Sequence, residues 1–301
     1  MDSLAKIADI LRRIDALGKW PEILYPMWVL KPHDSVFPYF PIVNPSRGDP
    51  ATKGHVSFLE GWQTFHDYNI WMQDKDAGFL SHPIELPGFN ILLKTDGTAS
   101  AVRQTPGFLV RDPDEKQSEL IAAMLWETYG MLMRLEENPK LAFKFLDDGC
   151  MLSREQGADG KWSDAPLKVV PPRRKTECVR LSKAALKVAK DLPILQDRVF
   201  KVEFGFDMRT FAAGFGGKRM AYRLKCTDSQ SQETVFEQMF AVQPPELNIQ
   251  DLWQNVPDAV LQKLVALAFI PGEIVVPNAR LFRLFRPLMG ELQFKLSMRR
   301  D

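Results

Sequence analysis

Apolar and polar residues alternate regularly in the last third of the chain. Phenylalanine or valine occupies every second position from Phe200 to Phe206, with polar or small residues between them. Successive side chains of a strand point to opposite faces, so this pattern predicts a strand over 199–206 with one buried face. The alternation recurs over 220–226, and a further strand is expected over 234–242 after a run of turn-forming residues. We therefore expect an antiparallel meander of three strands.

Helical and strand patterns then follow one another to residue 296. Helical spacing of apolar residues predicts helices over 249–267 and 279–292, and short apolar runs predict strands over 271–278 and 294–296. Pro257 lies inside the first helix, where it predicts a kink or a fresh helix start. Parallel strands joined through helices require right-handed crossovers. The C-terminal part is therefore expected to be an α/β domain with a mixed sheet.

Three antiparallel strands followed by alternating helices and parallel strands resemble the ribonuclease H-like fold of ribonuclease H, retroviral integrases and transposases. The segment 272–278, followed by an aromatic helix, is similar to the integrase segment whose fourth strand ends in Asp-Asn-Gly. Glu203 falls where that superfamily has its first-strand carboxylate. More loosely, the whole chain resembles a bacterial two-domain family of unknown function, which pairs such a C-terminal domain with an α+β N-terminal half.

The resemblance implies carboxylates that converge on two Mg²⁺ or Mn²⁺ ions. The position at the end of the fourth strand is Asn278, whose amide brings no charge to neutralise a divalent ion. We therefore expect a degenerate, noncatalytic domain without a metal. The alternative is a divalent-metal-dependent phosphodiesterase or nuclease, in which Glu203, either Asp207 or Asp228, and Glu291 converge despite Asn278. At least two of these carboxylates must then come close enough to share an ion.

The N-terminal half predicts an α+β domain over 1–155. An amphipathic helix is expected over 3–17, a hairpin over 90–104, and a long helix over 113–135 with Asp112 as its N-cap. Prolines and aromatic residues crowd the segment 20–41. Because proline disfavours central strands, we expect short edge strands, ordered loops and an aromatic-lined groove there.

Residues 156–175 are rich in glycine, aspartate, serine, proline and basic residues, which predicts a linker before a C-terminal domain at 176–301. A helix is expected over 177–190. Helical spacing places two basic triplets on one side of their helices, and they are candidate surfaces for a protein, peptide or nucleic-acid partner. The triplets are Lys183, Lys187 and Lys190, and Arg280, Arg283 and Arg286.

The composition narrows the classes of function. A net charge of +1 argues against broad binding to nucleic acid or anionic membranes, which normally requires a basic excess. Cys150, Cys178 and Cys226 form neither a paired framework nor a metal knuckle, so a reducing compartment is expected. The sequence contains no pattern typical of a signal peptide and no apolar run long enough for a bilayer. We expect a cytoplasmic, noncatalytic binding or scaffold protein.

Overall fold

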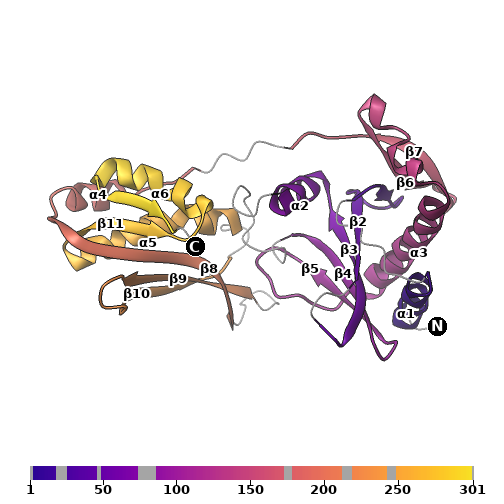
Figure 1. Ribbon diagram of the computed structural model, residues 1–301, viewed down its shortest axis with the longest axis horizontal. Coiled ribbons are helices and arrows are strands. Elements are labelled where there is room, and N and C mark those ends of the chain that lie inside the picture. Colours follow the sequence, from indigo (N-terminus) through magenta and orange to yellow (C-terminus); the bar gives the residue numbers. More distant parts are fainter. Residues whose placement is uncertain are drawn as a thin grey trace. The chain divides into compact units, whose positions relative to one another are not determined.

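The computed structural model describes most of the chain (Figure 1). The described ranges are 3–17, 26–45, 49–73, 86–172, 178–211, 219–242 and 249–299, with only the backbone described for 208–211. The chain divides into two compact units, and each combines helices with a mixed sheet. The first unit comprises Met1–Asn69, Pro83–Pro106 and Val110–Arg173, and the second comprises Ile70–His82, Gly107–Leu109 and Arg174–Asp301.

The first unit contains a seven-stranded sheet in the order β5-β4-β3-β2-β1-β6-β7. Neighbouring strands are antiparallel except β1 and β6, which are parallel. The strands are β1 (Val29–Lys31), β2 (Tyr39–Pro45), β3 (Thr52–Glu60), β4 (Gly88–Lys94), β5 (Ala99–Gln104), β6 (Cys150–Gln156) and β7 (Trp162–Lys168). The hairpin expected over 90–104 is confirmed as β4 and β5.

Strand β7 lies inside the segment that composition assigned to the linker. It pairs along its whole length with β6, from Cys150 opposite Lys168 to Gln156 opposite Trp162. Glycine and aspartate, which suggested a linker, form the turn between these strands instead: the Gly157 amide donates to the Lys161 carbonyl, 2.9 Å away. Composition alone does not separate a hairpin turn from a linker, because both favour the same residues.

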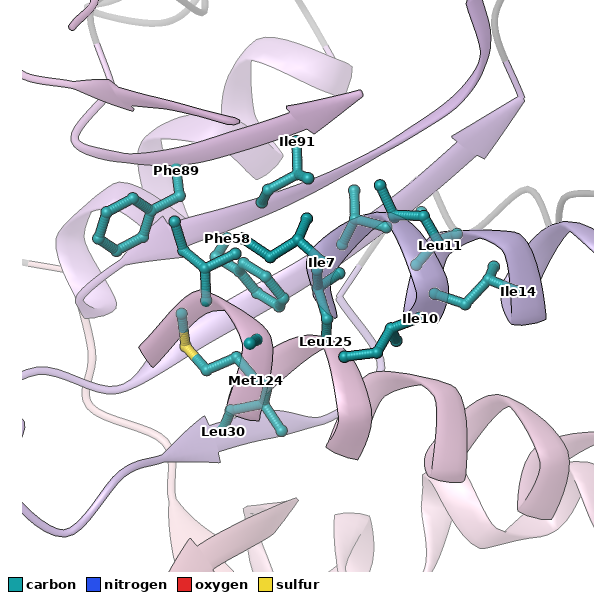
Figure 2. Close-up of a cluster of buried hydrophobic side chains, with 14 of the residues drawn as sticks. Ile7, Ile10, Leu11, Ile14, Leu30, Phe58, Phe89, Ile91, Met124 and Leu125 are labelled. Carbon is teal, nitrogen blue, oxygen red and sulfur yellow. The ribbon is translucent and has the colours of Figure 1, made fainter. Parts of the chain in front are cut away.

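Two helices, α1 (Ser3–Asp15) and α3 (Glu115–Glu137), cover one face of this sheet. Figure 2 shows their side chains meeting those of the strands, with Ile7 and Leu11 from α1 beside Phe58 and Ile91. The core also includes Ile10, Ile14, Leu30, Phe89, Met124 and Leu125. The amphipathic N-terminal helix is thus confirmed and packs into the core.

The long helix begins two residues later than its sequence suggested. Asp114, not Asp112, is the N-cap: its side chain accepts from the Gln117 backbone N–H at 2.8 Å, and the Gln117 side chain accepts from the Asp114 N–H at 3.1 Å. Two overlapping acidic motifs, Asp112 to Glu115 and Asp114 to Gln117, both fit a capping box. Glutamine at the third helical position can accept the N-cap N–H as glutamate does. The sequence therefore does not separate the two motifs, and in the structure Asp114 and Gln117 form the capping box.

Asp164 of β7 joins the sheet to α3 through two arginines. Arg134 donates to both of its carboxylate oxygens, at 3.0 and 2.5 Å, and Arg154 donates to Oδ1 at 3.0 Å. Arg154 also donates to Glu127 of α3 at 2.7 Å. Hydrogen bonding to Arg134 is the largest cause that lowers the pKa of Asp164 to about 2. The network fixes β7 against the helix.

We expect Asp164→Asn to lower the free energy of unfolding at pH 7 by about 1–2 kcal/mol, allowing for solvent screening. Because the folded-state pKa is depressed from 3.8 to about 2, the contribution is complete above about pH 4 and is lost as pH falls toward 2. Urea denaturation at pH 7 and pH 3 should therefore show a smaller difference between wild type and variant at pH 3. Asp159→Asn, at an exposed pair in the same hairpin, is the control. A difference independent of pH would contradict this account.

The second unit contains a five-stranded sheet in the order β10-β9-β8-β11-β12. β8, β9 and β10 form the antiparallel meander that alternation predicted, and β11 runs parallel to both β8 and β12. The strands are β8 (Ile194–Phe211), β9 (Arg219–Asp228), β10 (Thr234–Phe240), β11 (Ile270–Val276) and β12 (Lys295–Met298). The mixed sheet is thus confirmed.

Helices α4 (Lys183–Ala189), α5 (Ile249–Leu267) and α6 (Ala279–Leu292) belong to this unit. α5 continues through Pro257 as one helix, so no fresh start occurs there. Its Trp253 packs edge-on against Phe204 of β8, with ring centroids 4.8 Å apart, so α5 covers the apolar face of the meander. Asn278 caps α6 by accepting from the Leu281 N–H at 2.9 Å. Among the described residues, no helix is long and apolar enough to cross a bilayer.

Candidate functional site

The four candidate carboxylates do not lie together. Glu203 pairs opposite Lys225, and Asp207 lies four residues further along the same face of β8, which corresponds to about 13 Å. Asp228 pairs opposite Phe200, whose side chain is on the other, buried face of the sheet. The strand register therefore separates Asp228 from the other two by the thickness of the sheet.

Three of these carboxylates instead make structural pairs. Asp207 lies 3.2 Å from Arg223, and Glu291 lies 2.6 Å from Lys190, the C-cap of α4. The carboxylate of Asp228 closes a turn: backbone N–H groups of Gln230 and Ser231 hold its pKa below the ordinary value, with a smaller contribution from Arg198. Within the described ranges, no three acidic, histidine or cysteine side chains gather as metal ligands would.

The two basic triplets differ in their surroundings. All three lysines of the first are exposed, although Lys190 is engaged by Glu291. In the second, Arg280 is 6% exposed and its guanidinium stacks 4.1 Å from the centre of the Trp253 ring. Arg283 is half-buried and Arg286 is exposed. Helical spacing predicted one basic face on α6, but the first arginine is a core residue and is excluded from any binding surface.

The first unit contains a pocket of about 470 Å³ in the segment rich in proline and aromatic residues. Four parts of the chain form it: the loop before β2, the end of β3 with the start of α2 (Trp62–Gln73), Pro87 just before β4, and the residues that follow β7. Its lining consists of Val36, Phe37, Pro38, Glu60, Gly61, Trp62, Gln63, Pro87, Val170 and Pro171. Most of these are aromatic, proline or aliphatic, as binding pockets usually are.

The loop before β2 is held in place by Ser35. The Ser35 amide donates to the Pro32 carbonyl at 3.1 Å, and its hydroxyl donates to the Phe37 carbonyl at 2.9 Å. This turn leaves Val36 88% exposed and Phe37 49% exposed. Two large apolar side chains are therefore exposed to solvent on a loop whose backbone is already ordered. The loop loses less conformational entropy when a ligand binds, which lowers the free-energy cost of binding.

The helical wall of the pocket is a packed aromatic cluster. The ring of Trp62 lies edge-on to Phe40 at 4.9 Å and to Phe65 at 5.8 Å, while Phe40 stacks on Phe65 at 4.6 Å. Gly61 precedes the helix with a φ of +84°, a conformation that favours glycine, and its amide donates to the Pro38 carbonyl at 2.8 Å. These contacts fix the orientation of Trp62 and of the neighbouring loop.

Glu60 is the acidic group of the pocket, and Arg103 neutralises it. The two side chains form an ion pair, with 14% and 17% of their surfaces exposed. The Arg103 guanidinium also stacks 4.7 Å above the ring of Phe89. Burial raises the pKa of the adjacent Tyr39, so its hydroxyl stays protonated at neutral pH. The pocket therefore combines a mostly apolar lining with an acidic group, Glu60, whose charge is balanced by Arg103.

Residues that follow β7 complete the pocket. The Val170 carbonyl lies 2.7 Å from Nε2 of His66, whose ring stacks on Trp62 with centroids 6.2 Å apart. The sequence predicted short edge strands and an aromatic-lined groove in segment 20–41. Phe37 lies in this pocket, but the prediction of edge strands is wrong, because β1 and β2 lie inside the sheet. Trp62, Pro87 and Val170 were missed, because their proximity to Phe37 depends on strand order and on β7, which no local pattern indicated.

Comparison with known proteins adds no identification: no family model, curated protein or solved structure matches this chain.

Proposed function

We propose that the protein is a noncatalytic binding or scaffold protein whose first unit holds a ligand in the pocket of Phe37 and Trp62. The observation that carries this proposal is the exposure of Val36 and Phe37 on an ordered loop at an aromatic wall. Exposing large apolar side chains in this way gives no benefit to folding. It does provide a preformed anchor site, because apolar and aromatic anchors dominate the energy of protein interfaces.

A degenerate ribonuclease H-like domain is our proposal for the second unit. Its antiparallel meander, followed by parallel strands and intervening helices, supports that resemblance. Residence in the cytoplasm is likewise proposed, and it is supported by three cysteines that are all free. Lys183 and Lys187 remain a second candidate surface, because both are exposed on α4.

The phosphodiesterase alternative has less support, because it needs carboxylates that the register separates. We expect neither Mn²⁺ nor Mg²⁺ at millimolar concentration to raise the melting midpoint of the wild-type protein or of Glu203→Ala. A metal that binds only the folded state must raise the midpoint. A rise in the wild type that disappears in Glu203→Ala would revive the alternative.

Selection of peptides from a random library on the immobilised full-length chain tests the binding proposal. Peptides should be enriched, and at least one should bind wild type at least about tenfold more tightly than Phe37→Ser, because an anchor side chain contributes about 2 kcal/mol and tenfold corresponds to about 1.4 kcal/mol. Phe143→Ser removes an equally exposed phenylalanine (57% exposed) that does not line the pocket, and it should bind like wild type. Enrichment that Phe37→Ser leaves unchanged would contradict the proposed site.

A further inference from the structure

The chain itself places a valine–proline pair against the aromatic wall. Val170 and Pro171 line the pocket beside Trp62, and the Val170 carbonyl lies 2.7 Å from His66 Nε2. A residue before proline is restricted to extended conformations. The Val170–Pro171 dipeptide is therefore expected to be extended, and its contact with His66 attaches it to α2. The pocket of about 470 Å³ beside it leaves room for a ligand.

We propose that the ligand is an extended, proline-containing peptide segment of a partner protein. This inference rests on the proposed function. Such segments form polyproline II helices, which lack internal hydrogen bonds and lose little entropy on binding. They dock into aromatic-lined grooves, where rings pack against the pyrrolidines. Phe37 and Trp62 provide rings of this kind, and Val36 extends the apolar surface toward solvent.

The charge of the pocket selects against other ligands. Glu60, the acidic group among the described lining residues, is paired with Arg103, so these residues present no unbalanced charge to a phosphate or a strongly basic peptide. An amphipathic helix requires a row of anchor positions along several turns. The apolar residues here line a single pocket of about 470 Å³, and the structure gives no such row along a groove among the described residues. A neutral proline-rich segment fits both the charge and the shape.

Acetylated, amidated hexaproline is the probe, titrated calorimetrically into the full-length protein. We expect saturable binding with a Kd below about 1 mM. Phe37→Ser should weaken it at least tenfold, whereas Phe143→Ser should change it by less than twofold. A peptide of the same length and end groups with serine at every position should not bind. If hexaproline does not bind the wild-type protein, the proposal that the ligand is a proline-containing peptide is wrong.

Other outcomes separate this proposal from the function on which it rests. If library peptides without proline bind in a manner that depends on Phe37, the ligand class is wrong while the binding site stands. If the protein dimerises in solution and Phe37→Ser abolishes the dimer, a second copy of the chain is the occupant and the peptide proposal falls. If neither hexaproline nor any selected peptide depends on Phe37, both proposals fail.

Discussion

Trp253→Ala is expected to lower the free energy of unfolding of the second unit by about 3–5 kcal/mol, the usual cost of removing a large buried aromatic ring. The ring is fully buried between Phe204 of β8 and the guanidinium of Arg280. Its removal opens a cavity and removes the ring on which the buried guanidinium of Arg280 stacks. Hydrogen exchange of backbone amides in β8 and β9 measures this cost, because protection in a core strand reports the stability of its unit.

Two variants separate packing from other effects. The indole N–H of Trp253 makes no hydrogen bond to the described residues, so Trp253→Phe should recover much of the stability by filling part of the cavity. Trp126→Ala, on the surface of α3 in the first unit with 49% exposure, should leave amide exchange in β8 and β9 unchanged. Equal acceleration of that exchange by Trp126→Ala and Trp253→Ala would contradict the assignment of the cost to packing around Trp253.

Gly272→Ala should destabilise the second unit by about 2–3 kcal/mol, at the upper end of overpacking costs. A Cβ at this position would lie 2.6 Å from the Gln196 carbonyl oxygen and 2.7 Å from its Cα. Both are backbone atoms, so no side-chain rotation can relieve the contact, and β8 and β11 must separate. The pairing of these strands is already irregular between Pro271 and Glu273. Chemical denaturation followed by amide exchange in β11 measures the effect.

Gly205→Ala is the matched control for this substitution. Gly205 lies on β8 of the same sheet, and a Cβ added there meets no atom within 4 Å. The variant should be as stable as wild type or more stable by about 0.5 kcal/mol, because alanine loses less backbone entropy on folding. If Gly205→Ala were the more damaging of the two, the described pairing of β8 with β11 would be contradicted.

Local patterns were sufficient to predict much of the second unit. The spacing of Phe200, Val202 and Phe204 predicted the buried face of β8, and helical spacing predicted the bounds of α5 and α6. Each of these features depends on a few neighbouring residues. Two further features of the sequence, a glycine-rich run typical of a turn at 213–217 and an asparagine suited to an N-cap at position 248, lie outside the described residues.

Features that depend on distant residues were not predicted. Helical spacing placed Arg280 with Arg283 and Arg286, but whether an arginine faces solvent depends on what packs above it, which here is Trp253. The pocket required the start of α2 and the end of β7 to lie together, although Trp62 and Val170 are far apart in sequence. The periodicity of apolar residues predicts which face of a helix or strand is buried. It does not predict which other segments pack against that face.

Site-specific photo-crosslinking shows whether ligands bind at the Val36–Phe37 loop, as we propose. A photoactive phenylalanine analogue is placed at position 36, where the side chain is 88% exposed, and at position 143 as the control. On irradiation with a labelled peptide selected from the library, we expect covalent capture at position 36 and none at position 143. Equal capture at both positions, or capture at position 143 alone, would contradict the claim.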